Sequence, residues 1–345
     1  MRALITGAAG FIGSHLTEHL LKSTDWELVL VDKLAYASNG LARLNDIQAF
    51  SQAKNRVHMF PIDIAQPIPV MLEREIGSID YVLHLAAETH VDNSITDPRP
   101  FVMSNVVGTM EMLQFARRLN SRLKKFVLLS TDEVFGPAPE GVAYKENDRY
   151  NSTNPYSATK AAAEELCMAW ANSYGIPVVI VHAMNNFGER QHPEKFIPNT
   201  VRKILRREKI AIHANKNRTK AGSRQYIHAR NTSAAILFLL QKIGNGGSIR
   251  LRDKYNIVGE QEVDNLELVQ KIHQLMEKIL NQSFELNYEL VDFHGSRPGH
   301  DLRYCLNGDK LARMGWAPPK TFDESLEKTI QWMLNPKNLH WLLVD

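Results

Sequence analysis

The stretch "LITGAAGFIGSHL", Leu4 to Leu16, decides the fold, because it places three glycines between an apolar strand and a helix-like segment. Gly7 permits a tight turn, Gly10 lets backbone approach a pyrophosphate, and Gly13 lets the helix pack closely on the strand. The helix N-terminus adds N–H donors and a partial positive charge. The spacing is G-x-x-G-x-x-G rather than the commoner G-x-G-x-x-G, so the interpretation depends on its context.

An acidic residue lies where such a turn needs one. The run "LVLVD" ends in Asp32, nineteen positions after Gly13, where a carboxylate can bind the ribose hydroxyls of an adenosine. The carboxylate would repel a 2′-phosphate, so it favours NAD over NADP, although Lys33 follows directly and weakens that preference. Asp63 and Ile64, at the end of the third predicted strand, would then flank the adenine.

Short apolar runs alternate with helical patterns through the first half of the chain. They are "RALITG", "ELVLVD", "RVHMFPIDI", "IDYVLHLAA", "KKFVLLST" and "PVVIVHAM". Apolar strands separated by helices predict a parallel sheet buried on both faces. After Asn186 the pattern becomes irregular. We therefore expect an α/β fold with a Rossmann-type doubly wound parallel sheet (1–184) and a smaller, irregular α/β substrate-binding lobe (185–345), the chain crossing back to the first domain.

Composition excludes several classes of protein. The 345 residues carry a formal charge of only +3, which is too weak to indicate nucleic acid, and no apolar run is long enough for a membrane span. The two cysteines lie far apart, so neither a disulfide framework nor a cysteine metal site is predicted. His15 and His19 have metal-ligand spacing but no third ligand nearby. The sequence opens on a strand-like "MRALITG" without a signal peptide, so we expect a cytoplasmic location and no metal.

The segment "NPYSATKAAAEEL" sets Tyr156 four residues before Lys160, which puts both on one helix face. A free tyrosine has a pKa of about 10, so a tyrosine acting as a base near neutral pH needs its phenolate stabilised by about 4 kcal/mol. A nearby ammonium and an oxidised nicotinamide, both cations, could together supply this. After a dinucleotide-binding turn, the pair indicates a catalytic dehydrogenase-type site.

The stretch "STDEVFG", Ser130 to Gly136, puts two carboxylates directly after the apolar run "KKFVLL". One interpretation is a strand that leaves the core into a polar turn, with Asp132 as a cap. The other is that Thr131, Asp132 and Glu133 present a hydroxyl, an acid and a base to one substrate. Both remain open from this stretch alone.

Seven segments resemble the extended short-chain dehydrogenase/reductase family, and within it the nucleoside-diphosphate-glucose 4,6-dehydratases, of which the dTDP-glucose 4,6-dehydratases are best known. They run from residue 6 to residue 304 in the family order. The glycine turn and the Tyr-Lys pair identify only the superfamily, whereas "TDEVFG" with "HPEKFIP" and "RPGHD" is more specific. The segments are "TGAAGFIG", "VDKLAYASN", "HLAAETHVDNSI", "STDEVFG", "NPYSATKAAAE", "NNFGERQHPEKFIP" and "RPGHDLRY".

The resemblance implies a lyase reaction in three steps. Tyr156 takes the proton of the sugar 4-hydroxyl while hydride passes from C4 to NAD, and Thr131 hydrogen-bonds the same oxygen. The 4-ketone acidifies the C5 proton, which Glu133 removes while Asp132 protonates the departing 6-hydroxyl. Hydride then returns to C6, and a proton reaches C5. Asp132 must hold a proton beforehand, so its pKa should be raised by burial or by Glu133.

The resemblance also implies two sets of binding residues. Those for the cofactor are Gly7, Gly10, Phe11, Ile12, Gly13, Asp32, Lys33, Asp63, Ile64, Ala86, Tyr156 and Lys160. Those for the sugar nucleotide are Thr89, Asn185, Lys195, Arg224, Asn256, Arg297, His300 and Tyr304.

One segment departs from the family. Where members usually carry "P-V-Y-G-D-G-x-x-x-R-D-W", this chain has the longer and more basic "IAIHANKNRTKAGSRQYI", with His213 near the usual tyrosine. The nucleotide base therefore stays open between dTDP-glucose, UDP-glucose and an N-acetylated sugar nucleotide.

The same residues leave three other functions open, and the family resemblance predicts a homodimer. A sugar-nucleotide 4-epimerase would use the Tyr-Lys pair without needing the two carboxylates, and a 5,6-dehydratase would stop at an exocyclic alkene. A non-catalytic NAD-binding regulator would be expected to have lost the tyrosine, the lysine or the acids, and this chain keeps them all. Helices near 101–119 and 158–173 pair across a two-fold axis in the family, so we expect a homodimer with a four-helix contact.

Overall fold

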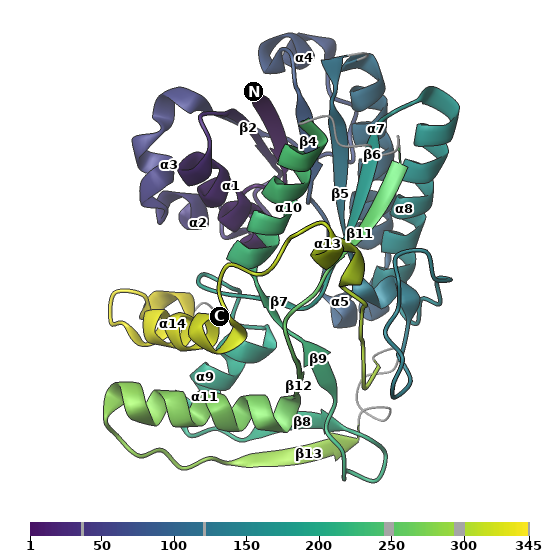
Figure 1. The fold of residues 1–345 in the computed structure, drawn as a ribbon. Helices are drawn as coiled ribbons and strands as arrows, with labels where there is room; N and C mark the ends of the chain where they lie inside the picture. Colours follow the sequence, from purple (N-terminus) through teal and green to yellow (C-terminus); the bar gives the residue numbers. More distant parts are fainter. Residues whose placement is uncertain (36–37, 120–121, 245–251, 293–300, 344–345) are drawn as a thin grey trace.

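A seven-stranded parallel sheet forms the centre of the computed structural model, which describes residues 1–35, 38–119, 122–244, 252–292 and 301–343 (Figure 1). Neighbouring strands pair in parallel throughout, as the nearly continuous apolar runs predict. In sheet order the strands are β11 (Arg252–Ile257), β6 (Val178–Ala183), β5 (Lys125–Thr131), β4 (Tyr81–His84), β1 (Arg2–Thr6), β2 (Glu27–Asp32) and β3 (Val57–Pro61).

Helices cover both faces of the sheet, because successive strand residues point to opposite sides and both sides are apolar. Along β1, for example, Ala3 and Ile5 lie in one core and Leu4 lies in the other. The first core packs against α1 (Phe11–Ser23), α2 (Ala42–Asn45), α3 (Gln48–Gln52) and α10 (Ala229–Gly244). The second packs against α4 (Val70–Ile76), α7 (Gly108–Leu119) and α8 (Pro155–Tyr174). The predicted doubly wound α/β fold is confirmed.

A smaller lobe with its own core lies beside the carboxyl ends of the strands, at the bottom of Figure 1. Its helices are α9 (Phe196–Arg206), α11 (Asn265–Leu280) and α14 (Phe322–Leu334). Three two-stranded sheets complete it: β8 (Ile210–Ala214) with β13 (Tyr288–Asp292), β9 (Ser223–Gln225) with β12 (Glu262–Asp264), and β7 (Asn186–Phe187) with β10 (Ile227–His228). Between these elements the chain returns to the large sheet as α10 and β11.

Short helices connect the larger elements. The helix expected over 101–119 is divided, since a π-helical segment, η3 (Val102–Val107), precedes α7. This wider turn brings Asn105 to the backbone of Glu88, with which it exchanges two hydrogen bonds (2.8 and 3.1 Å). The remaining short helices are α5 (Val91–Thr96), α6 (Arg99–Phe101), α13 (Asp309–Arg313), η2 (Lys54–Arg56), η5 (Asp132–Phe135) and η6 (Leu339–Trp341). Within the described ranges, every helix is too short or too polar to cross a bilayer.

Candidate active site

A cavity of about 370 Å³ runs along the carboxyl ends of β1, β2, β4, β5 and β6, where open parallel sheets bind ligands. A second cavity of about 200 Å³ adjoins it on the side of the smaller lobe, and the two share Thr89, Glu133, Asn185 and Lys195. The predicted cofactor residues that line the larger cavity are Gly7, Gly10, Phe11, Ile12, Gly13, Asp32, Lys33, Ile64, Ala86, Tyr156 and Lys160.

The glycine turn at one end of this cavity has no room for side chains. Gly7 has a φ of +69°, and its backbone N–H donates to Val31 O (2.8 Å). A Cβ on Gly13 would stand 2.0 Å from Gly7 O, so that position accepts only glycine. Gly10 is the N-cap of α1 and supplies no side-chain cap, so the first N–H groups of the helix are left for an anionic ligand.

An acidic and a basic residue, Asp32 and Lys33, follow the turn. Asp32, at the end of β2, is buried and accepts hydrogen bonds from the backbone N–H of Ala9 (3.0 Å) and Leu34 (2.8 Å). Burial raises the pKa of its carboxyl, and those backbone bonds oppose the change. Lys33 donates to Glu88 Oε1 (2.6 Å), so its ammonium is already paired within the cavity.

Of the two residues predicted to flank the adenine, only Ile64 lines the larger cavity. Ile62 and Ile64 line the cavity, whereas the exposed Asp63 does not. The carboxylate of Asp63 instead accepts a hydrogen bond from the backbone N–H of Ala65 (3.0 Å) and shapes the turn after β3.

The two carboxylates of "STDEVFG" lie where β5 runs into η5. Asp132 is 4% exposed; its Oδ1 accepts a hydrogen bond from Thr131 Oγ1 (3.0 Å), and no described residue hydrogen-bonds to its Oδ2. Glu133 is half-buried and accepts one from Asn154 Nδ2 (3.2 Å). Burial raises the pKa of Asp132; burial and then the Asp132 carboxylate raise that of Glu133 to about 7. The pair therefore faces the cavity in a state suited to proton transfer near neutral pH.

The raised pKa of Glu133 makes the stability of the protein depend on pH. Between about pH 4.5 and about pH 7 the folded protein holds a proton that the unfolded chain has released, so stability should fall as the pH rises through this interval. Glu133→Gln removes the titration and should unfold at a higher temperature than wild type at about pH 8, with little difference at about pH 5. Thermal unfolding at both values measures this, and a pH-independent difference would contradict it.

Tyr156 and Lys160 lie in the first two turns of α8. Asn154 starts that helix by a capping box with Ser157, and Pro155 occupies the first turn, so the tyrosine is fixed at the helix start. Burial and then Glu133 raise the pKa of Tyr156, while a hydrogen bond with the Thr131 side chain opposes this. Lys160 Nζ donates to Leu129 O (2.7 Å), and burial lowers its pKa to about 8. The phenol thus stays protonated until a positive charge stands beside it.

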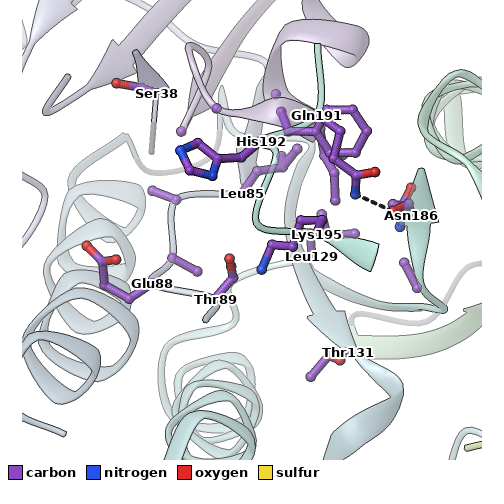
Figure 2. Close-up of a pocket in the computed structure, with 18 of the residues that line it drawn as sticks. Ser38, Leu85, Glu88, Thr89, Leu129, Thr131, Asn186, Gln191, His192 and Lys195 are labelled. Carbon is purple, nitrogen blue, oxygen red and sulfur yellow. Dashed lines mark hydrogen bonds between the residues drawn. The ribbon is translucent and has the colours of Figure 1, made fainter. Parts of the chain in front are cut away.

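The predicted sugar-nucleotide residues are placed in three ways. Thr89, Asn185 and Lys195 line both cavities, and Figure 2 labels Thr89 and Lys195 among the lining side chains. Arg224 lines the second cavity but donates to the backbone carbonyls of Ser223, Asp301 and Leu302 (2.6–2.7 Å), and its guanidinium stands 4.5 Å from the ring centre of Tyr304, which lines the same cavity. Arg297 and His300 lie outside the described residues.

The prediction for Asn256 is wrong in this structure. Asn256 is fully buried in β11 and lines neither cavity. Its Nδ2 donates to the carbonyls of Tyr144 and Asn307 (both 3.0 Å), and its Oδ1 lies 3.0 Å from His182 Nδ1. A side chain with all its polar atoms used inside the protein stabilises the edge of the sheet instead of meeting a ligand.

Several lining residues were missed by sequence reasoning. Gln191, whose Nε2 donates to Asn186 O (2.8 Å), and His192 line the larger cavity, and Glu194 lines both (Figure 2). They belong to the stretch "ERQHPEKF", in which the sequence analysis predicts only Lys195 as a binding residue. Their place in the same loop as Lys195 is the sequence feature that could have identified them. Glu88 also lies in a quoted segment, between Ala86 and Thr89 in "HLAAETHVDNSI", but its pairing with Lys33 crosses 55 positions and has no local pattern.

The histidines with metal-ligand spacing lie behind the glycine turn. His15 is buried, its Nε2 lies 3.0 Å from Glu189 O, and its ring packs edge-on against Phe11 and His228. Burial, and then Arg190, lower its pKa to about 3, so the ring is neutral. In the described parts of the chain no group of three His, Cys, Asp or Glu side chains is placed to hold a metal ion.

Comparisons with known proteins agree with this geometry. The probable dTDP-glucose 4,6-dehydratase of Sinorhizobium fredii is 36% identical over 342 residues, covering 97% of this chain and 93% of the relative. The dTDP-glucose 4,6-dehydratase of Salmonella typhimurium is 34% identical over 359 residues, covering 99% and 94%. The crystal structure of DesIV, a dTDP-glucose 4,6-dehydratase from Streptomyces venezuelae with NAD bound, has a TM-score of 0.83 at 31% identity and 98% coverage of both chains.

More distant structures share the fold alone. The UDP-glucuronic acid 4-epimerase of Bacillus cereus has a TM-score of 0.81 at 24% identity, covering 96% of this chain and 99% of its own.

The family model for GDP-mannose 4,6 dehydratase matches residues 4–329. The resemblance drawn from the motifs is confirmed, and this chain belongs to the GDP-mannose 4,6 dehydratase family.

Proposed function

We propose that this protein is a lyase that converts a nucleoside-diphosphate-glucose, with NAD, into the 4-keto-6-deoxy sugar nucleotide. The observation that carries the proposal is the acid pair. A buried carboxyl oxygen of Asp132, to which none of the described residues hydrogen-bonds, lies beside a glutamate whose pKa is about 7, in the same cavity as Tyr156 and Lys160. Redox chemistry at C4 needs only the last two, so the acids indicate elimination.

The residues present fit NAD. The glycine turn and the uncapped start of α1 would hold its pyrophosphate, and Asp32 would hold the adenosine ribose. The Lys33–Glu88 ion pair leaves that lysine less able to attract a 2′-phosphate, which supports NAD over NADP. When bound, NAD would supply the acceptor for the hydride of C4 and the donor that returns it to C6, while C5 takes up a proton.

Tyr156 and Lys160 serve the oxidation. Tyr156 takes the proton of the 4-hydroxyl, and the ammonium of Lys160 stabilises the phenolate that makes this possible. Thr131, which shares a hydrogen bond with Tyr156, would orient the same sugar oxygen. Because burial opposes both the phenolate and the ammonium, the two charges need each other in this cavity.

Asp132 and Glu133 serve the elimination. Glu133 takes the C5 proton that the 4-ketone has made acidic, the C6–O bond breaks, and Asp132 gives its proton to the leaving hydroxyl, which departs as water. A base with a pKa near 7 and an acid with a raised pKa are the protonation states that this step needs. Residues 1–184 would then bind NAD, and residues 185–345 would chiefly bind the sugar nucleotide.

The substrate would enter between the sheet and the smaller lobe. Thr89 would lie beside the sugar, Asn185 and Lys195 beside the diphosphate, and Tyr304 toward the nucleotide. The first three line both cavities, and Tyr304 lines only the second, on the side of the smaller lobe, which supports this arrangement. His213, in the segment that departs from the family, lines the second cavity. We propose a pyrimidine nucleotide, dTDP- or UDP-glucose, as the substrate.

A panel of dTDP-, UDP-, CDP- and GDP-glucose, followed by appearance of the 4-keto product, tests the function. We expect turnover with a pyrimidine sugar nucleotide and release of the 4-keto-6-deoxy sugar. A 4-epimer as product would favour the epimerase, an exocyclic alkene the 5,6-dehydratase, and NAD binding without any turnover the non-catalytic regulator.

Gly13→Ala should weaken NAD binding. The added Cβ would stand 2.0 Å from Gly7 O, so the turn that receives the pyrophosphate must open. We expect the Kd for NAD to rise at least about tenfold, measured by calorimetry. Gly40→Ala is the control, because its Cβ meets nothing within 4 Å and its φ of +57° adds only local strain. Equal affinities for wild type and Gly13→Ala would contradict the assignment.

We also propose a cytoplasmic homodimer. The outer surfaces of η3 and α8 carry Val102 (44% exposed), Met103 (45%) and Tyr174 (46%), which supports helix-to-helix contact there. Sedimentation at micromolar concentration should give twice the mass of one chain, and charged substitutions at Val102 and Met103 should give monomers. A wild-type protein that sediments as a monomer would contradict the proposed dimer.

A further inference from the structure

A buried carboxylate lies on the catalytic helix outside both cavities. Glu164 is one turn of α8 beyond Lys160 and two turns beyond Tyr156, so all three share one face of the helix. Its exposed fraction is 0%, and it lines neither cavity. A buried charge of this kind is costly unless it is paired, so its partners indicate what it is for.

Glu164 and Lys160 hold two consecutive residues of β5. Lys160 Nζ donates to Leu129 O (2.7 Å), and Ser130 Oγ donates to Glu164 Oε1 (2.5 Å). The next residue is Thr131, followed by the acid pair. The strand end that carries the elimination groups is therefore fastened directly to the helix that carries the oxidation groups.

The second carboxylate oxygen reaches the next two strands. Glu164 Oε2 lies 3.0 Å from His182 Nε2 on β6 and 3.5 Å from Lys254 Nζ on β11, and it accepts a hydrogen bond from Tyr150. Ser130 is in register with His182, so these contacts come from the same side of adjacent strands. One carboxylate thus joins α8 to three neighbouring strands, near the carboxyl ends of β5 and β6 and within β11.

We propose that Glu164 is a positioning residue for the reaction proposed above, on which this inference rests: it fixes the end of β5 against α8 and keeps Lys160 in its charged form. The first role follows from the hydrogen bond to Ser130. The second follows from a full negative charge one helical turn from a buried ammonium.

The charged and titratable groups around Lys160 support the second role of Glu164. Burial lowers the pKa of Lys160, and Glu164 is the foremost group that raises it again, with a further contribution from Cys167 on the same helix. From β4, His84 faces Lys160, and burial, followed by the Lys160 charge, lowers the pKa of that histidine to about 3, so it is neutral. Tyr156 is the other titratable group of the site on α8, and it too is neutral in the free protein.

Glu164→Gln in the NAD-loaded protein tests the proposal, because the amide keeps the shape and removes the charge. We expect kcat to fall about 10- to 100-fold with little change in KM, since misplaced groups lose rate more than affinity. We also expect the alkaline limb of the kcat profile to move to lower pH by about one unit. Glu164→Asp should recover part of the rate and the wild-type limb. Glu165→Gln, which removes the same charge from the exposed neighbour, should leave both unchanged.

Ser130→Ala separates the two roles and also serves if Glu164→Gln does not fold. It removes only the hydrogen bond to Oε1 and keeps the charge, so we expect a lower kcat, by about tenfold, with the alkaline limb in place. A wild-type rate in Ser130→Ala would contradict the proposal that Glu164 positions the end of β5 through Ser130.

A second readout does not depend on turnover. The pKa of Lys160, followed in ¹³C-lysine spectra and assigned with Lys160→Arg, should be lower in Glu164→Gln than in wild type. If no sugar nucleotide reacts with wild type while this pKa still falls, the proposed function fails and the charge coupling stands. If the pKa stays unchanged in Glu164→Gln, the proposal is overturned even where the rate drops, because only a structural role then remains.

Discussion

Replacing Tyr156 by phenylalanine should lower turnover of the sugar nucleotide by about 10²–10⁴-fold while the protein still binds NAD. The phenyl ring can keep its edge-on packing against Phe101 in the small buried cluster at the start of α8. Only the proton acceptor for the 4-hydroxyl is lost. Steady-state rates and NAD affinity, measured on the same preparation, separate the two effects.

Tyr174→Phe is the matched control for this variant. It removes a hydroxyl from the last turn of the same helix, where the ring is 46% exposed and packs against Trp170 and Arg117. We expect its turnover to equal that of wild type. Should Tyr156→Phe keep more than about a tenth of the wild-type rate, less than about 1.4 kcal/mol would be at stake and Tyr156 would not be the base.

Glu133→Gln and Asp132→Asn should separate oxidation from elimination. Oxidation at C4 uses Tyr156, Lys160 and NAD, so both variants should still reduce bound NAD when substrate is added, seen at the absorbance band of the reduced nicotinamide. Glu133→Gln should lose exchange of the C5 proton with solvent, and Asp132→Asn should exchange it but release water slowly. General acid–base groups are worth about 10²–10⁴-fold, so overall turnover should fall by that order.

The amide replacements keep the shape of both side chains, which makes lost packing a poor explanation for such an effect. Glu140→Gln serves as a control, because this carboxylate is 90% exposed and pairs with the exposed Lys220. Full C5 exchange and full turnover in Glu133→Gln would mean that the acid pair is a polar turn after a strand. An epimerase-like reaction would then be favoured over dehydration.

Local spacing explains why so much of this site was predictable from sequence. A strand, a tight turn and a helix of fixed geometry place Gly7, Gly10 and Gly13 against one another wherever the rest of the chain lies. Helical periodicity puts Tyr156 and Lys160 on one face, and the end of a parallel strand puts Thr131 and its two acidic neighbours at the ligand-binding edge. Each of these relations spans only a few residues, so the amino-acid order by itself determined the turn and the places of the candidate catalytic groups. The roles of Asp132 and Glu133 came from the resemblance to the family, since the stretch alone left them open.

The tertiary structure decided which polar groups meet across long stretches of chain. Sequence could not pair Lys33 with Glu88, or Ser130, His182 and Lys254 with Glu164, because these contacts depend on strand order and register. The same register takes Asn256 into the sheet and away from the ligand. The raised pKa of Asp132 agrees with the expectation from sequence, whereas the pKa shifts of Glu133, Tyr156 and Lys160 were not predicted, for a related reason. Burial, which no local pattern fixes, is the largest effect on the pKa of Glu133, Tyr156 and Lys160 alike.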